Sequence, residues 1–259
     1  MSDLRLFNIK NGSIEPKQTA DKPALKALVS KNAGALLGLT VIGWDLPLGG
    51  SDSEVVETLA YDENFQLTVV EYRMGKFNGT INKGLVYLDF IKNNYGKIRS
   101  FLSEKLGAEL TKQIRLNPRL IVVGDDFNRY DEYAIKQMPY VIDLVKCQPY
   151  GKNFLLLEKN YQSKKVVVDE EYAFPSTIEN VDLRKMIGEY ILSLGDEICE
   201  TITKSFIYYR KIKTFAYLLY EDGFVINLLS GGKFKAVKIR SVKDLVKNES
   251  LIEKSYDEN

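Results

Sequence analysis

The chain has 259 residues, enough for one large domain or two modest domains with a proper hydrophobic core. Its 36 Lys and Arg residues nearly balance 35 Asp and Glu residues, and a net charge of +1 argues against a protein that coats polyanions with its whole surface. Histidine is absent, which excludes Ser-His-Asp and Cys-His nucleophile sites and histidine-ligated zinc hydrolases. Any catalysis therefore rests on carboxylates, lysines, tyrosines or a metal ion that carboxylates hold.

Other features that the sequence lacks limit the cellular location and the kinds of site that we expect. The longest apolar run, residues 33–44, is too short and too rich in glycine to span a bilayer, and the N-terminus lacks a signal-peptide pattern. Cys147 and Cys199 are isolated and have no CxxC spacing, which favours buried thiols over a disulfide or a zinc site. The sequence also lacks GxxxxGK[ST] and GxGxxG loops. We expect a cytoplasmic protein with no membrane partner.

Strands alternating with helices are predicted for residues 1–160. In chain order they are an edge strand near 4–7, a helix over 22–37, a strand over 39–42, strands over 55–61 and 66–73, helices over 81–92 and 98–110, a strand over 119–124, a helix over 130–137, and strands over 141–145 and 154–158. Asp125 or Asp126 is expected to cap the 130–137 helix, whose Tyr130 and Tyr133 are expected to pack rather than stack on a ligand. This order indicates an α/β domain.

The polar character of residues 161–180 predicts a linker, and residues 181–259 then form a smaller α+β domain. Its predicted elements are a long helix over 183–202, three strands over 214–220, 224–229 and 234–240, and a last helix that begins at Ser241.

The hairpin of residues 55–73 carries the candidate chemistry. Alternation along its second strand places Glu71 and Arg73 on one face. A turn at residues 62–64 brings Glu57 of the first strand to within about one residue of lying opposite Glu71. Two carboxylates and a cation on one sheet surface form either a metal site or a closed ion cluster. Hard oxygen ligands favour Mg²⁺ or Mn²⁺ over zinc.

Several segments resemble one family in their order and spacing. They are residues 31–38 (KNAGALLG), 57–64 (ETLAYDEN), 69–73 (VVEYR), 81–88 (INKGLVYL), 118–124 (PRLIVVG) and 127–131 (FNRYD). Together they resemble the uncharacterised bacterial and archaeal proteins related to the mismatch endonuclease NucS, some of which carry the label "predicted transport protein". These proteins belong to the PD-(D/E)XK, or restriction-endonuclease-like, superfamily. Residues 191–196, 206–210 and 251–256 also resemble the small accessory domain that often follows.

The resemblance implies a restriction-endonuclease-like core, a mixed central sheet flanked by helices, and a set of site residues. The family's metal-binding Asp and Glu correspond to Glu57 and Glu71, and its lysine corresponds to Arg73. A family glutamine corresponds to Lys83, which is expected to substitute for the missing lysine, and a family glutamate corresponds to Ser30. Because a guanidinium stays protonated, Arg73 is expected to contact the scissile phosphate rather than to act as a base.

Two functions stay open at this point. The first is a divergent endodeoxyribonuclease, in which Glu57 and Glu71 hold Mg²⁺ or Mn²⁺ and Arg73 and Lys83 complete the catalytic set. The second is a nuclease-fold protein that has lost hydrolysis, in which Arg73 closes an ion cluster with the two glutamates. That protein needs no cofactor and serves as a nucleic-acid-binding or protein-interaction module. Because the NucS relatives act as dimers, the resemblance also implies a homodimer.

Basic residues outside the hairpin are candidates for contacting nucleic acid. They are Lys76, Arg210, Lys211, Lys233 and Lys235. Lys233 and Lys235 are expected to share a sheet face with Tyr208, Tyr217 or Phe234, which suits contacts to a nucleic-acid backbone or single strand. The alternative is a solvated sheet face without a ligand.

Overall fold

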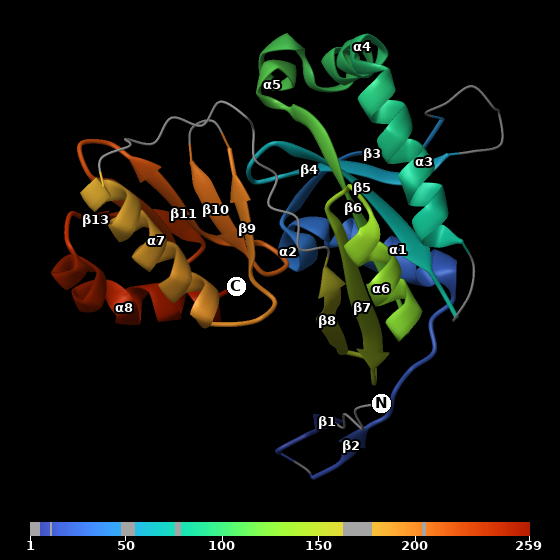
Figure 1. The fold of residues 1–259 in the computed structure, drawn as a ribbon. Coiled ribbons are helices and arrows are strands. Elements are labelled where there is room, and N and C mark those ends of the chain that lie inside the picture. The colour runs from blue at the N-terminus through green and yellow to red at the C-terminus, as the bar shows by residue number, and fades with distance from the viewer. Residues whose placement is uncertain (1–5, 11, 48–54, 76–78, 163–177, 204–205) are drawn as a thin grey trace. The chain divides into compact units, whose positions relative to one another are not determined.

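The computed structural model describes residues 6–10, 12–47, 55–75, 79–162, 178–203 and 206–259 (Figure 1). The chain divides into two compact units, Met1–Ser163 (unit 1) and Lys164–Asn259 (unit 2). Most of the predicted linker, residues 163–177, lies outside the described residues, and its two ends belong to a strand and a helix. Within the described ranges, no helix is both long and apolar enough to cross a membrane.

Unit 1 is built on a mixed sheet of six strands in the order β3-β4-β5-β6-β7-β8. The strands β3 (Leu39–Leu46), β4 (Val56–Asp62) and β5 (Gln66–Arg73) run antiparallel to their neighbours in this group. The strands β5, β6 (Arg115–Gly124) and β7 (Ile142–Tyr150) are parallel, and β8 (Phe154–Gln162) is antiparallel to β7. A separate two-stranded ribbon is formed by β1 (Leu6–Phe7) and β2 (Ile14–Glu15).

Helices cover both faces of this sheet (Figure 1). On one face, α3 (Thr80–Asn93) packs against β5 and β6, and a core of Val69, Leu120, Leu88 and other apolar residues fills the space between them. The described residues of this unit form five further helices: α1 (Lys22–Lys31), α2 (Ala33–Leu37), α4 (Tyr95–Leu106), α5 (Ala108–Gln113) and α6 (Arg129–Gln137). Alternate residues of the strands, including Thr58 and Tyr72, face α1 instead, because the side chains of a strand point in turn to opposite faces.

The α/β class predicted for this part of the chain is confirmed, but several boundaries differ. The predicted helix over 22–37 is two helices that meet at Asn32. The strand predicted from residue 119 begins at Arg115, and its register shifts near Pro118, which cannot donate a ladder hydrogen bond. The predicted caps of α6 were wrong, since Asn128 caps the helix and forms a capping box with Asp131.

Unit 2 is an antiparallel sheet of five strands covered by two helices, which fits the predicted α+β class. The sheet order is β13-β12-β11-β10-β9, with the strands β9 (Cys199–Ile202), β10 (Ile207–Arg210), β11 (Thr214–Tyr220), β12 (Phe224–Ser230) and β13 (Lys233–Ile239). The helices α7 (Ile178–Ser193) and α8 (Val242–Asp257) contact each other and pack on the sheet (Figure 1). The predicted helix over 183–202 was wrong beyond Ser193, because Cys199–Ile202 forms β9.

Candidate functional site

Two glutamates of the β4–β5 hairpin lie beside each other in the interior. Thr58 pairs with Val70 across the hairpin, so the next residues outward along each strand are Glu57 and Glu71. The backbone N–H of Glu57 donates a 3.1 Å hydrogen bond to Oε1 of Glu71. Glu57 is 6% exposed and Glu71 is 0% exposed. The predicted pairing of the two carboxylates is therefore confirmed.

Lys83 of α3 bridges the two carboxylates. Its Nζ lies 3.0 Å from Oε2 of Glu71 and 3.3 Å from Oε1 of Glu57. The next residue, Gly84, allows this approach, because a Cβ there would lie only 2.5 Å from the Leu120 side chain of β6. A side chain at residue 84 would thus push α3 away from the sheet that carries Glu71. The resemblance implied that Lys83 lies near the hairpin, and these distances show that it does.

A second lysine reaches Glu57 from α1. Lys22 Nζ lies 2.5 Å from Oε1 of Glu57, and 42% of the lysine side chain is exposed. Asp21 holds the start of α1 by accepting a hydrogen bond from the Ala24 N–H. Sequence reasoning missed Lys22, because the contact joins residues 35 positions apart and no motif marks it. The ammonium groups of Lys22 and Lys83 thus both contact the same oxygen atom of Glu57.

Arg73 does not occupy the place predicted for it. Its guanidinium forms an ion pair with Asp131 of α6 at 3.0 Å, and its Nε donates a 3.1 Å hydrogen bond to the Gly75 carbonyl. Its Cζ also lies 5.0 Å from the centre of the Phe127 ring. The interpretation in which Arg73 closes an ion cluster with the two glutamates was wrong, since Lys83 and Lys22 make those contacts. Arg73 instead holds the end of β5 to the first turn of α6.

Burial changes the proton affinity of the site. The pKa of Glu71 is raised to about 7, chiefly by burial, which outweighs the hydrogen bond from the Glu57 N–H; the charge of Glu57 also raises it, and Lys83 lowers it. Burial lowers the pKa of Lys83, but the two carboxylates outweigh this effect and raise it above its ordinary value. Lys83 is therefore a cation at neutral pH, and Glu71 exchanges its proton in the physiological range.

The opposite face of the hairpin carries a set of hydroxyl groups. Tyr72, between Glu71 and Arg73 in sequence, places its hydroxyl 3.0 Å from Ser30 Oγ and 3.2 Å from Thr58 Oγ1. Burial raises the pKa of Tyr72 above its ordinary value, so it stays neutral. Ser30, at the position of a family glutamate, is thus a hydrogen-bond partner that holds α1 to the hairpin, not a third carboxylate.

A second buried ion network lies in the same sheet. Arg119 of β6 is 3.0 Å from Asp143 and 3.4 Å from Asp62, and it donates a 3.2 Å hydrogen bond to Thr68. Lys159 approaches the other oxygen of Asp143 at 3.6 Å. All four charged side chains are at most 4% exposed. Because cations already face both carboxylates, we regard this network as structural.

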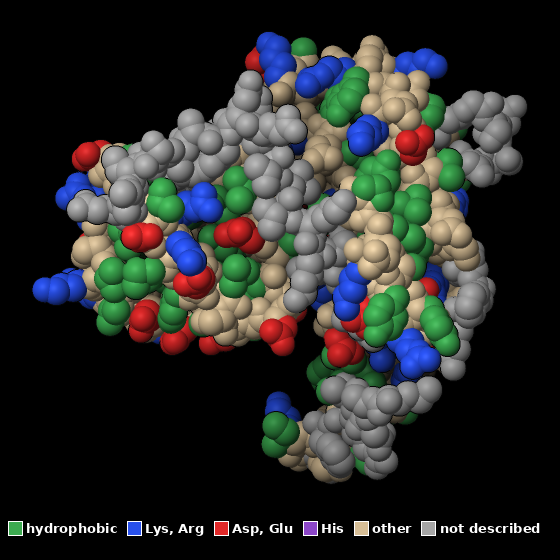
Figure 2. All heavy atoms as spheres, in the orientation of Figure 1, with side chains coloured by type: hydrophobic (Ala, Val, Ile, Leu, Met, Phe, Trp, Pro, Cys, Tyr) green, Lys and Arg blue, Asp and Glu red, His purple; other side chains and the backbone are tan. Residues whose placement is uncertain are grey.

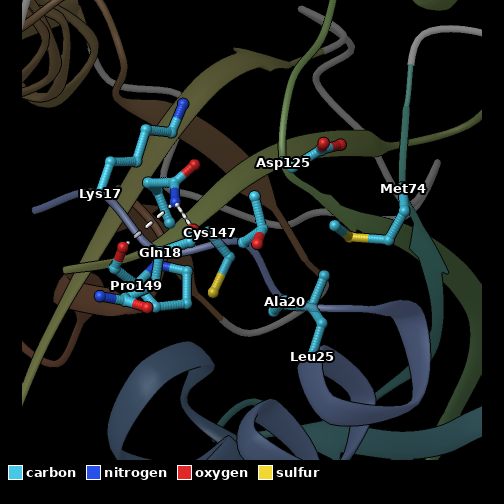
Figure 3. Close-up of a pocket in the computed structure, with 10 residues that line it drawn as sticks. Lys17, Gln18, Ala20, Leu25, Met74, Asp125, Cys147 and Pro149 are labelled. Atoms are coloured by element: carbon cyan, nitrogen blue, oxygen red, sulfur yellow. Dashed lines mark hydrogen bonds between the residues drawn. The ribbon is translucent and has the colours of Figure 1, made fainter. Parts of the chain in front are cut away.

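The structure has a pocket of about 180 Å³ in unit 1 (Figure 3). Met74 and Asp125 lie on one side of it, at the ends of β5 and β6, and Cys147 and Pro149 of β7 contribute to the other side. Burial raises the pKa of the Cys147 thiol to about 12, so this cysteine is a poor nucleophile. Glu57 and Glu71 do not line this pocket.

The basic candidates of unit 2 differ in exposure. Arg210 is 1% exposed, and Lys211 donates a hydrogen bond to the Tyr256 carbonyl. Lys233 and Lys235 are exposed and alternate along β13 with Phe234, whose ring contacts Tyr217 at 5.0 Å. The two lysines therefore point away from the aromatic face, and the expectation of a shared face was wrong. Lys76 lies outside the described residues.

A divalent cation at this site would rely on Glu57 and Glu71. Oε2 of Glu71 is buried and accepts no hydrogen bond, although Lys83 faces it as an ion-pair partner. In the described part of the chain, no three His, Cys, Asp or Glu residues gather as a ready-made metal site. Two carboxylates still fit Mg²⁺, which keeps several waters and commonly binds one or two carboxylates together with substrate phosphates. Lys22 and Lys83 would compete with such an ion.

Comparisons of this chain with protein-family models, curated proteins and solved structures find no match.

Proposed function

We propose that unit 1 is a divergent nuclease domain of the PD-(D/E)XK type, which hydrolyses DNA phosphodiester bonds with Mg²⁺ or Mn²⁺ held by Glu57 and Glu71. The observation that carries the proposal is the position of Lys83, whose Nζ lies within 3.3 Å of both carboxylates. A lysine beside two metal-binding carboxylates is the combination that the family chemistry needs. The mixed six-stranded sheet, with the carboxylates on its β4–β5 hairpin, also supports this assignment.

Each residue of the proposed site has its own role. Glu57 and Glu71 would hold the ion, which would supply stabilisation of charge on the phosphate and activation of water. Lys83 remains protonated because both carboxylates raise its pKa, so it stabilises negative charge rather than accepting a proton. Arg73 supports the site by holding α6 to β5 through Asp131. Because its guanidinium pairs with Asp131, Arg73 is not assigned a contact with the scissile phosphate.

Cleavage assays test this function directly. The protein is incubated with single-stranded, duplex, mismatched and branched DNA in Mg²⁺ or Mn²⁺, beside the variants Glu57→Gln and Glu71→Gln. Glu109→Gln is the matched control, because Glu109 is 86% exposed on α5. We expect the two hairpin variants to lose cleavage and the control to retain it. Cleavage that neither hairpin substitution changes would end the proposal.

A second candidate function rests on the same contacts. Lys22 and Lys83 both reach Oε1 of Glu57, which is the arrangement of an ion cluster that needs no metal. Such a protein would use the fold to bind nucleic acid or another protein without hydrolysis. It predicts no heat of Mg²⁺ or Mn²⁺ binding at millimolar concentration. Metal binding that disappears in Glu71→Gln would exclude it.

A further inference from the structure

The outer face of α6 carries two exposed tyrosines. Tyr130 is 64% exposed and Tyr133 is 63% exposed, three positions apart on the helix. The prediction that they pack in the interior was wrong, since Ile135 on the other side of α6 contributes to the core instead. Residues three apart lie on the same side of a helix, so the two rings are neighbours on one surface.

Each of these rings has a basic partner on the same helix. The Arg129 guanidinium carbon lies 5.2 Å from the centre of the Tyr130 ring, and Lys136 Nζ lies 5.7 Å from the centre of the Tyr133 ring. Figure 2 shows hydrophobic and basic side chains next to one another over this part of unit 1. Aromatic rings interleaved with cations suit a ligand with flat bases and a phosphate backbone.

The acidic side chains of α6 are already paired. Asp131 faces Arg73 of β5 at 3.0 Å, and Glu132 faces Lys136 at 2.5 Å. Their charges are thus offset within the protein, while Arg129 remains exposed beside Tyr130. The helix is also firmly held, by its capping box at Asn128 and by the ion pair to Arg73. A rigid surface loses little conformational entropy when a ligand binds.

The same ion pair sets the distance between α6 and the glutamates. Arg73 lies two residues after Glu71 on β5, a separation of about 7 Å along a strand. Asp131, its partner, lies between Tyr130 and Tyr133 in sequence. The helix that carries the two tyrosines is therefore held beside the end of the strand that carries Glu71.

We propose that Arg129, Tyr130 and Tyr133 form a binding surface for single-stranded nucleic acid. Unpaired bases stack on the two rings, and Arg129 contacts a phosphate, while Lys136 stays paired with Glu132 beside the Tyr133 ring. A duplex does not suit this surface, because its bases are stacked on one another and present no free ring face. The inference deepens the proposed function by assigning an unpaired strand as the ligand of this domain. It rests on that function for the cleavage of the bound strand.

Binding measured by fluorescence anisotropy in EDTA tests the surface separately from cleavage. Labelled oligothymidylate, oligouridylate and a duplex are titrated with the full chain and with the double variant Tyr130→Ala/Tyr133→Ala. Tyr95→Ala is the matched control, since Tyr95 is a 49% exposed tyrosine at the start of α4. Tyr130→Phe/Tyr133→Phe keeps both rings.

We expect the double alanine variant to bind single strands at least about 20-fold more weakly, because the loss of each stacking contact weakens binding by about fivefold or more. The phenylalanine variant and Tyr95→Ala should bind like the wild type. Stronger binding of one of the two oligonucleotides identifies DNA or RNA as the strand. The proposal is overturned if the wild type binds neither strand, if the alanine variant binds normally, or if duplex binding falls equally. Binding of single strands by the wild type, without cleavage of any DNA in Mg²⁺ or Mn²⁺, would count against the proposed function alone.

Discussion

Lys83 and Glu71 form an ion pair of 3.0 Å between α3 and β5, in which the carboxylate is fully buried and a third of the lysine side chain is exposed. The lysine is thus the accessible partner, and Glu57 is its second contact at 3.3 Å. This geometry has one consequence. A metal ion held by the two carboxylates would compete with the Lys83 ammonium group for their oxygen atoms.

Metal affinity is predicted to depend on pH because of Glu71. Its pKa is raised to about 7, chiefly by burial, so protons compete with a cation below this value. We expect Mn²⁺ to bind more tightly as the pH rises from 6 to 8, with most of the gain below pH 7. Isothermal titration calorimetry in buffers of matched ionic strength measures this. An affinity that stays constant over this range would contradict the assignment of Glu71 as a ligand.

Stability without metal is predicted to have the opposite pH dependence. Because the pKa of Glu71 is about 7 in the folded protein and 4.5 ordinarily, the folded state binds more protons than the unfolded state between these values. The contribution of Glu71 is therefore fully present below the unfolded pKa and is lost as the pH rises through the folded pKa. The loss is on the order of 3 kcal/mol.

The variant Glu71→Gln should remove most of this pH dependence. Urea unfolding of both proteins at pH 5 and pH 8 in EDTA measures the difference. We expect the wild type to lose more stability than the variant between these two conditions. Parallel losses would show that Glu71 is not the group that titrates.

Removing Lys22 is predicted to strengthen metal binding. Lys22 lies 2.5 Å from Oε1 of Glu57, so it competes with a cation for that oxygen. Replacement by methionine keeps most of the side-chain volume and removes the charge. We expect Lys22→Met to bind Mn²⁺ several-fold more tightly, on the order of the 1 kcal/mol that a partly exposed ion pair contributes.

Lys26→Met is the control for this experiment. Lys26 lies on the same helix and pairs with Asp45 rather than with Glu57. It should leave Mn²⁺ affinity unchanged. If both variants shift the affinity equally, the effect is one of overall charge and the competition at Glu57 is not its cause.

Gly84 is predicted to be required for the position of Lys83. A Cβ at residue 84 would lie 2.5 Å from the Leu120 side chain, which is itself fully buried. Overpacking of this kind costs about 1–3 kcal/mol. We expect Gly84→Ala to lower both the free energy of unfolding and the metal-dependent cleavage rate. The double variant Gly84→Ala/Leu120→Ala should regain part of the cleavage rate, because it restores space for α3. No recovery would argue that the clash with Leu120 is not the cause of the lower rate.

The hairpin could be predicted from sequence because its information is local. Alternation along residues 66–73 and the turn after Asp62 fix which side chains share a face, so the pairing of Glu57 with Glu71 followed. The partners of these residues could not be derived in this way. Lys22, Lys83 and Asp131 come from three helices whose packing on the sheet decides the contacts.

The errors have similar physical causes. Ile198 and Ile202 continue the four-residue spacing of α7, but residues four apart also share a face of a strand, so the spacing alone could not distinguish the two. The exposure of Tyr130 and Tyr133 depends on how α6 is rotated against the sheet, which its ion pair to Arg73 helps to set. The nuclease assignment itself still rests on the family resemblance together with the geometry of the glutamates and Lys83.

The cleavage rate of Lys83→Met tests the central claim most directly. It is measured in Mg²⁺ or Mn²⁺ on whichever DNA the wild type cleaves, beside Lys112→Met, a lysine of α5 that is 68% exposed. We predict metal-dependent cleavage by the wild type and by Lys112→Met. For Lys83→Met we predict a rate that is lower by about 100-fold or more, the usual effect of removing a group that stabilises transition-state charge. Equal rates for Lys83→Met and the wild type, or no cleavage by the wild type on any DNA, would contradict the account.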